Sequence, residues 1–265
     1  MNNFCLAGGV ALNCDMNAKI KSLPFIDNIY IQPAANDAGT AIGSALELAN
    51  KLGDNSDFHM DHAYWGPEFS NDEIEKVLKE AKVSFHKVKN IESVAAHHLA
   101  KGKIVGWFQG RLEIGPRALG NRSILAHPGQ KGMKDKINNE VKHRETWRPF
   151  APSVLDEVGT RYFENYFTHP FMNIAFFVTQ KGQKDLSQAI HVDNTARIQS
   201  VTKTANPRYH QLISEFAKIS GIPAVLNTSF NDAEQPLVCT PKEAIKTFFG
   251  TGLDILAIGD FLLEK

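Results

Sequence analysis

The sequence contains no apolar run that approaches the ~20 residues needed to span a bilayer. Its amino terminus, MNNFCLAGGVALNC, lacks the basic segment and long apolar stretch of a secretory signal. The three cysteines, Cys5, Cys14 and Cys239, are odd in number and too scattered for a zinc knuckle. We therefore expect free thiols in a reducing cytoplasm and no association with a membrane.

Net charge is also absent, since 29 basic residues balance 29 acidic ones. A neutral chain argues against general binding to nucleic acid. The sequence has no Gly-x-Ser-x-Gly elbow, HExxH motif or P-loop, which disfavours hydrolase triads, zinc metalloproteases and Walker-type nucleotidases. With 43% hydrophobic and 22% charged residues, the composition is that of a globular protein with a substantial core.

What the sequence does have is a concentration of positive charge in residues 101–150. This segment holds eleven Lys and Arg residues against four acidic ones, and five of the eight arginines lie between positions 111 and 148. A solvated basic face would contain more lysine and more acid. Arginines among Gly and Pro favour a small anionic ligand over a plain surface patch, because guanidinium binds phosphate or carboxylate bidentately.

Strand and helix patterns alternate along the chain, which predicts an α/β protein with a mixed twisted sheet. Ser70 and Glu73 predict a capping box at the start of one helix. Pro207 and Pro241 occupy the first turns of two others, the second after the N-cap candidate Thr240. Strands are expected at 3–7, 28–32, 83–88, 103–109, 122–126, 150–155, 172–179, 195–202, 223–227 and 254–258. Helices are expected at about 10–22, 37–52, 70–82, 91–101, 131–141, 207–219 and 241–249.

The domain organisation follows from a break in this pattern. Residues 53–66 have poor periodicity and several turn formers, so we interpret them as a linker. The preceding 52 residues give only two strand–helix units, too few to bury both faces of a sheet. We therefore expect residues 1–58 to be the end of a larger domain and residues 59–265 to be a second domain.

Two motifs of the first segment are candidates for ligand contact. In LAGGVALN, Gly8 and Gly9 join a strand to a helix and would let backbone amides approach a phosphate. A Gly-Gly pair at the end of a strand is also commonly just a turn. In QPAANDAGTAIG, Asp37 stands at the start of a helix, and its position by itself favours an N-cap over a metal ligand.

The strongest motif is GWFQGRLEIGPRALGNRSILAHP, which places Arg117 and Arg122 around a Gly-bearing corner after a strand. The next, NNEVKHRETWRPFAPSVL, brings Lys142, Arg144 and Arg148 within seven residues. Any one of these cations could have a structural role. A lysine and several arginines on consecutive loops favour a triphosphate together with a second anion.

Two later segments add polar candidates. In HVDNTARIQSV, His191 and Asp193 offer two metal ligands without a third, and Arg197 should point to one face of a strand. In GIPAVLNTSFN, an apolar strand ends in Asn227 and Ser229, at the end of a strand where α/β sheets bind ligands. For these last residues, turn formation is an equal alternative.

Together these motifs, which cover essentially the whole chain, resemble the O-carbamoyltransferase family that includes the nodulation-factor, cephalosporin and aminoglycoside carbamoyltransferases. The resemblance implies a carboxyl-terminal domain of the YrdC-like (threonylcarbamoyl-adenylate synthase) fold, preceded by a domain of the actin-like ATPase fold. In that family, the carboxyl-terminal domain makes carbamoyl-adenylate from carbamoyl phosphate and ATP. The amino-terminal domain binds metal and nucleotide and passes the carbamoyl group to a hydroxylated small-molecule acceptor.

The resemblance also assigns residues to these sites. It implies an adenylation pocket, working with Mg²⁺, in which Lys142, Arg148 and Arg197 are catalytic and Arg117, Asn227 and Ser229 bind substrate. It places Gly8, Gly9 and Asn13 near the nucleotide of the amino-terminal domain. It makes Asp37 a ligand of iron or a similar divalent metal, in the intact enzyme only.

The histidine pair that supplies the other metal ligands in the family has no counterpart here. We therefore expect an incomplete transfer site and a missing amino-terminal segment, in an expressed fragment or one half of a split enzyme. Two alternative functions stay open. One is a threonylcarbamoyl-adenylate synthase of tRNA modification, which would use bicarbonate and threonine. The other is a non-catalytic nucleotide-binding half that needs a partner chain.

Overall fold

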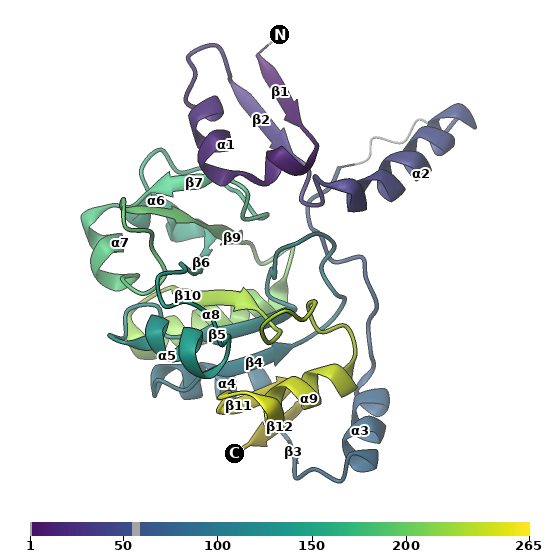
Figure 1. Ribbon diagram of the computed structural model, residues 1–265, viewed down its shortest axis with the longest axis vertical. Coiled ribbons are helices and arrows are strands. Elements are labelled where there is room, and N and C mark those ends of the chain that lie inside the picture. Colours follow the sequence, from purple (N-terminus) through teal and green to yellow (C-terminus); the bar gives the residue numbers. More distant parts are fainter. Residues whose placement is uncertain (1, 55–58) are drawn as a thin grey trace.

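Figure 1 shows the computed structural model of the chain, which describes residues 2–54 and 59–265. An eight-stranded sheet of order β3-β12-β11-β4-β5-β10-β6-β9 forms its centre. β4 runs parallel to β11 and β6 to β9, whereas the other neighbouring strands are antiparallel, which confirms the expected mixed sheet. The strands are β3 (His86–Lys87), β4 (Val105–Phe108), β5 (Arg122–Ala126), β6 (Ala151–Leu155), β9 (Gln199–Val201), β10 (Ala224–Ser229), β11 (Ile255–Ile258) and β12 (Phe261–Glu264).

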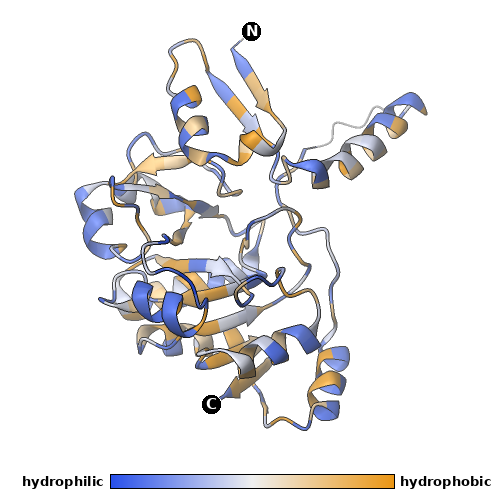
Figure 2. Cartoon of the chain, in the orientation of Figure 1, coloured by the Kyte–Doolittle hydropathy of each residue, from blue (hydrophilic) through white to orange (hydrophobic). Residues whose placement is uncertain are grey.

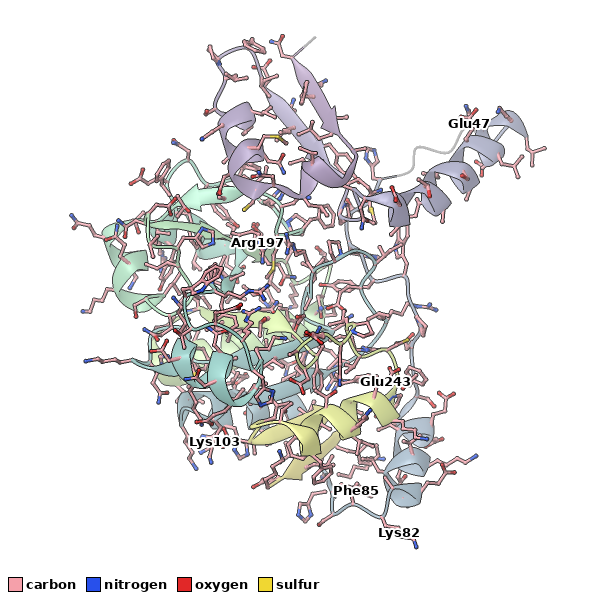
Figure 3. The ribbon with its side chains drawn as sticks, viewed as in Figure 1. Glu47, Lys82, Phe85, Lys103, Arg197 and Glu243 are labelled. Carbon is pink, nitrogen blue, oxygen red and sulfur yellow. The ribbon has the colours of Figure 1, made fainter. Side chains whose placement is uncertain are left out.

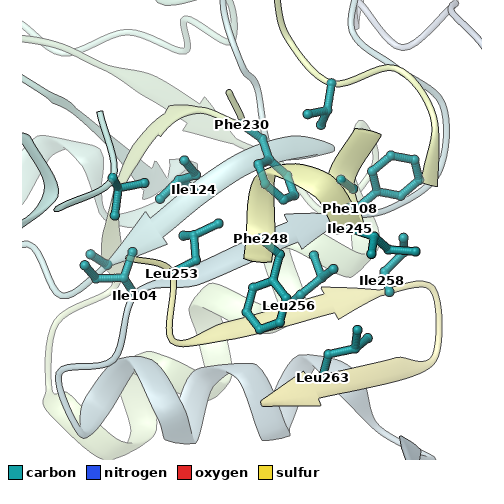
Figure 4. Close-up of a cluster of buried hydrophobic side chains, with 14 of the residues drawn as sticks. Ile104, Phe108, Ile124, Phe230, Ile245, Phe248, Leu253, Leu256, Ile258 and Leu263 are labelled. Atoms are coloured by element: carbon teal, nitrogen blue, oxygen red, sulfur yellow. The ribbon is translucent and has the colours of Figure 1, made fainter. Parts of the chain in front are cut away.

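Helices cover both faces of this sheet. Trp107 and Phe108 are adjacent on β4 and fully buried, but they belong to different hydrophobic clusters, because side chains alternate between the faces of a strand. The face with Phe108 also buries Phe230 and Phe248, as the close-up in Figure 4 shows. Burial on both sides explains why β11 (ILAI) is entirely apolar and why β5 and β10 are apolar over part of their length (Figure 2). The helices are α4 (Ile91–Ala100) and α8 (Pro207–Ser220) on one face, and α3 (Asn71–Glu80), α5 (Met133–Glu140) and α9 (Pro241–Gly250) on the other.

The helix starts agree with the sequence. Ser70 and Glu73 form the expected capping box of α3, and Thr240 and Glu243 form another at α9. Pro207 lies in the first turn of α8. These signals are local, so the sequence is sufficient to predict them.

The first segment packs against the rest of the chain through its inner side. Ala11 and Ile31 are buried in one hydrophobic cluster with Phe163 and Phe176 of the later segment. β1 and β2 pair in parallel. The elements are β1 (Asn3–Leu6), a 3₁₀ turn η1 (Gly9–Leu12), α1 (Cys14–Lys21), β2 (Asn28–Ile31), a second 3₁₀ turn η2 (Asp37–Gly39) and α2 (Thr40–Lys51).

Helix α2 projects away from the body of the molecule in Figure 1. None of its residues is buried, and its leucines are exposed, with Leu48 at 57% and Leu52, which ends the helix, at 78%. No helix in the described part of the chain is both long and apolar enough to cross a membrane.

Several elements differ from the expectation. The predicted helix at 10–22 is divided at Asn13 into η1 and α1, and the predicted strand at 195–202 is divided at Ile198. β12 was not predicted, nor were two helices of four and six residues, which are too short to show a period. The remaining elements are η3 (Asp156–Val158), α6 (Gly159–Tyr162), β7 (Ala175–Phe177), α7 (Gln180–Asp185) and β8 (Thr195–Arg197).

The structure also bears on the predictions made for the linker and for Asp37. Residues 59–66 of the predicted linker are irregular, with one isolated bridge from Tyr64 to Glu113. Residues 55–58 lie outside the described range, and the predicted end of the first domain, at residue 58, lies there too. The N-cap interpretation of Asp37 is wrong. Asn36 occupies the cap position of η2, no side-chain cap bond forms, and Asp37 is the first residue of the turn, with an exposed side chain.

Candidate functional site

The candidate site contains two arginines, Arg117 and Arg197, whose side chains have no partner among the described residues. Neither guanidinium makes a hydrogen bond or ion pair with any residue in the described part of the chain, and the Nε atom of each is fully enclosed. Burial, with the nearby charge of Arg117, lowers the pKa of Arg197 to about 10; burial also lowers that of Arg117. Two cations desolvated side by side without a counterion are unfavourable unless an anion joins them.

Arg117 is carried by the corner Gly115–Gly120. Both glycines have φ of 101°, a conformation that a side chain would strain. At Gly115 a Cβ would also lie 2.7 Å from the carbonyl oxygen of Pro33, so the first segment closes over this corner. Arg197 is the last residue of β8, and in Figure 3 it lies between α1 and β10.

The amino-terminal end of α1 faces these arginines. Cys14 and Asp15 are close enough for their charges to act on Arg197. Burial raises the pKa of the Cys14 thiol, an effect that Arg197 and Arg117 oppose. Asn13 caps α1, since its Oδ1 accepts from the backbone N–H groups of Asp15 and Met16 at 3.1 and 3.0 Å. Asn13 thus satisfies the first N–H groups of the helix, and Cys14 and Asp15 at its start lie near the cations.

Lys142 is buried beside the carboxyl end of β10. Its ammonium group donates to the carbonyl oxygens of Ser229 (2.8 Å) and Asn231 (2.9 Å) and to the side-chain oxygens of the same two residues. Burial, together with the charges of Arg144 and Arg148, lowers its pKa to about 7. This ammonium is therefore held in place but is easily deprotonated.

Two further cations complete the group that we call the cation cluster, namely Arg117, Lys142, Arg144, Arg148 and Arg197. Arg144 stacks on Phe150, 4.9 Å from the ring centre, and donates from Nε to Asn138 at 2.8 Å. Burial and the charge of Arg148 lower the pKa of Arg144 to about 10. Arg148 is exposed. A hollow of about 450 Å³ opens beside Arg144 and is also lined by Asn139, His143 and Glu145.

Asn227 and Ser229, the predicted polar residues of β10, are largely occupied within the protein. Asn227 is buried and donates from its amide to Ala118 O, Ser153 Oγ and Gln199 Oε1. Its own Oδ1 is enclosed without a partner. Ser229 donates to Asn231 at 2.7 Å. Both therefore hold neighbouring groups of the cluster in place.

The other predicted candidates lie apart from the cation cluster or have structural partners. Gly8 has a φ of 96° and donates its N–H to Ala35 O at 2.7 Å, whereas a Cβ at Gly9 would meet nothing within 4 Å. Arg122 is fully buried; it donates to Gln109 O at 2.7 Å, and its guanidinium stacks on a phenylalanine ring. Sequence reasoning could not separate it from Arg117.

A metal site does not fit the described residues. Nowhere in 2–54 or 59–265 do three His, Cys, Asp or Glu side chains come together to bind an ion. Asp37 is exposed on η2. Asp193 instead accepts from the backbone and hydroxyl of Thr195, and His191 Nδ1 lies 2.9 Å from the same hydroxyl. The described residues therefore hold no set of three such ligands for a transition metal such as iron.

Sequence reasoning missed the residues that hold the site together. Glu113 accepts one backbone N–H group of the Arg117 corner, that of Leu119, and those of the two residues just after the corner, Asn121 and Arg122. Asn231 binds both Lys142 and Ser229. The one available signal for Glu113 was that it is the only acid between residues 101 and 134. Asn231 gave none, because it resembles any turn former.

The chain is thus an α/β protein in which five cations lie near one another, two of them, Arg117 and Arg197, without a hydrogen-bonding partner among the described residues, an arrangement suited to an anion. Comparison with known proteins gives the particular family. The model described as "Carbamoyltransferase C-terminus" matches residues 96–265, and "Carbamoyltransferase N-terminus" matches residues 1–46. The chain belongs to the carbamoyltransferase family, as its motifs indicated.

Two curated relatives illustrate the match. The chain is 43% identical over 272 residues to nodulation protein NolO of Bradyrhizobium diazoefficiens, covering all of this chain and 50% of that protein. It is 36% identical over 227 residues to the 3'-hydroxymethylcephem-O-carbamoyltransferase of Streptomyces clavuligerus, covering 85% of this chain and 42% of the relative. The chain thus spans about half the length of the curated relatives it matches.

Solved structures are more distant. Sua5 of P. abyssi, in a crystal structure with L-threonine, matches with a TM-score of 0.44 and 11% identity, over 63% of this chain and 46% of that one. Full-length HypF, in a phosphate- and nucleotide-bound form, matches with a TM-score of 0.41 and 17% identity, over 68% of this chain and 22% of that one.

Proposed function

We propose that this chain activates carbamoyl phosphate with ATP to give carbamoyl-adenylate, as the carboxyl-terminal part of an O-carbamoyltransferase. The observation that carries the proposal is the pair Arg117 and Arg197, two guanidinium groups held close together without a partner in the described chain. Membership of the carbamoyltransferase family supplies the reaction class. A YrdC-like fold for residues 59–265, and an actin-like origin for residues 1–58, belong to the same proposal.

The chemistry has two steps. Water cleaves the bond between the carbamoyl group and phosphate, releasing carbamate and inorganic phosphate. A carbamate oxygen then forms a bond to the α-phosphorus of ATP, and the bond to the bridging oxygen breaks, so that pyrophosphate leaves with the electron pair. No residue of the chain is needed as a covalent nucleophile.

The cation cluster has a clear task in this scheme. Carbamoyl phosphate and ATP are both polyanions that repel each other in water. Fixed guanidinium groups of Arg117 and Arg197 would bring them together and stabilise charge on the transferring phosphoryl group. Lys142, held against Ser229 and Asn231, would contact a phosphate oxygen as its charged form rather than act as a base.

The first prediction is that the chain releases pyrophosphate from ATP only when carbamoyl phosphate is present. A coupled pyrophosphate assay with ATP plus carbamoyl phosphate, ATP plus threonine and bicarbonate, and ATP alone measures this directly. Release with threonine and bicarbonate in place of carbamoyl phosphate would identify a threonylcarbamoyl-adenylate synthase. Equal release under all three conditions, or none from folded protein, would overturn the proposal.

The exposed side of the first segment suggests where the rest of a carbamoyltransferase binds. Large hydrophobic side chains are exposed on β1, η1, β2 and α2, and α2 has no buried residue. The N-terminus family model ends near the middle of α2, and the relatives are about twice as long as this chain. We propose that an amino-terminal polypeptide covers α2 and completes the metal site at Asp37 for transfer to the hydroxylated acceptor.

The second prediction tests this surface. Changing Leu48 and Leu52 to glutamate should leave pyrophosphate release and the melting temperature of the chain unchanged, because neither side chain is buried. The same change should weaken binding of the amino-terminal half of a full-length relative, added as a separate polypeptide, by about tenfold or more.

Ile219→Glu is the matched control, since Ile219 is 51% exposed but lies on α8, away from the first segment. Binding can be followed by surface plasmon resonance. Unchanged affinity in the Leu48/Leu52 variant, or no binding by the wild-type chain, would contradict the proposed surface.

A further inference from the structure

We propose that Glu113 is a positioning residue that fixes Arg117 in the anion site. This inference rests on the proposed function of the cation cluster. Glu113 lies within the basic segment and is buried, with 4% of its surface exposed. Among the described residues it forms no ion pair with any cation of that segment. Its carboxylate has another use.

One oxygen of Glu113 binds the backbone at the end of the Gly115–Gly120 corner and of the two residues after it. Oε1 accepts from the N–H groups of Leu119 at 2.8 Å, Asn121 at 2.7 Å and Arg122 at 3.1 Å. Three converging donors suit an ionised carboxylate, because hydrogen bonds to a charged acceptor are shorter and stronger than those to a neutral one. Oε2 is enclosed and has no partner, so all of the bonding of this side chain serves the corner.

The carbonyl groups of the same corner are bound from the other side. Asn227 donates to Ala118 O, Trp107 donates to Gly120 O at 3.0 Å, and both Gln199 and Tyr64 donate to Leu119 O. The peptide groups after Arg117 are therefore fixed by side chains of the sheet and its surroundings. Glu113 supplies the only acid among them.

The guanidinium of Arg117, in contrast, has no partner within the described residues. Its position depends on the backbone that carries it, since no other side chain holds it. A ligand-binding group must be held within a fraction of an ångström of its productive position to be effective. Loss of the three bonds from Glu113 would release the corner and let Arg117 move away from the anion.

The test measures binding of inorganic pyrophosphate by titration calorimetry, which needs no turnover. Glu113→Ala should weaken pyrophosphate binding about tenfold or more. Glu113→Gln keeps an acceptor oxygen but not the charge, so its affinity for pyrophosphate should lie between those of Glu113→Ala and the wild type. In an Arg117→Ala background, Glu113→Ala should cause no further loss, because Glu113 acts through Arg117.

The matched control is Glu92→Gln. Glu92 is another buried carboxylate, on α4, where it pairs with Arg208 at 2.5 Å. Its loss should lower the melting temperature and leave pyrophosphate affinity unchanged. If Glu113→Ala does not fold, Glu113→Gln together with its Arg117→Ala combination gives the same comparison.

Wild-type affinity in a folded Glu113 variant, or a loss that adds fully to that of Arg117→Ala, would overturn the role of Glu113 alone. Failure of the wild-type chain to bind pyrophosphate would overturn the anion site itself, and with it the proposed function. The wild-type titration therefore separates the two.

Discussion

Replacing Arg197 by methionine is expected to reduce carbamoyl-phosphate-dependent pyrophosphate release by about 100-fold or more, while leaving the chain as stable as the wild type or more stable. Without a ligand, Arg197 is a desolvated cation that the charge of Arg117 destabilises, and although the charge of Asp15 acts on it, no described acid forms an ion pair with it. Removing an uncompensated charge relieves that repulsion, whereas removing a pairing partner would not. Activity and stability should therefore change in opposite directions.

The lysine variant sharpens this prediction. Arg197→Lys keeps the charge but replaces a planar fork by a point charge, so we expect a loss of about tenfold or more, equivalent to ~1.4 kcal/mol in transition-state binding. Arg161→Met is the control, because Arg161 is an exposed arginine on α6. Steady-state pyrophosphate release and thermal unfolding measure the two effects. Full activity of either Arg197 variant would assign this residue a structural role.

Replacing Lys142 by methionine is expected to abolish most activity and to remove a distinctive dependence of stability on pH. Burial lowers the pKa of Lys142 from 10.5 to about 7. Between these values the unfolded chain binds a proton that the folded chain does not, so the contribution of Lys142 to the free energy of unfolding increases with pH. This contribution to the free energy of unfolding can rise by up to about 1.4 kcal/mol per pH unit.

The measurement is urea unfolding of wild type and Lys142→Met at several values between pH 7 and pH 9. The difference in free energy of unfolding should shift in favour of the wild type as pH rises. Well below pH 7 the difference should be constant, because the lysine is then charged in both the folded and the unfolded state. Lys136→Met is the control, since Lys136 is only partly buried and pairs with Asp254 at 3.4 Å. A pH-independent difference would contradict the lowered pKa.

This pKa also bears on function. An anion bound beside Lys142 favours its charged form and would raise the pKa again. The ammonium would then contact phosphate as a cation, consistent with its role as a clamp. The hydrogen bonds to Ser229 and Asn231 hold the amine in position in either state.

Much of the fold could be predicted from the sequence because its determinants are local. Alternation of apolar segments predicted most strands of the large sheet, and the capping box at Ser70 and the N-cap candidate Thr240 marked two helix starts. The sequence failed where an element is short, as at α6, or where tertiary pairing divides a strand, as at Ile198. At these positions, contacts with other segments of the chain decide the secondary structure, and local secondary-structure propensity has little influence.

The arginines, glycines and prolines between residues 111 and 148 predicted an anion ligand, and the motifs indicated the carbamoyltransferase family. Which cations have partners could not be predicted and depends on the folded chain. Arg111 pairs with Glu68, Arg122 donates to backbone carbonyls, and Arg117 and Arg197 have no partner among the described residues. The physical reason is that charge is a property of a residue, whereas burial and pairing depend on segments far away in the chain.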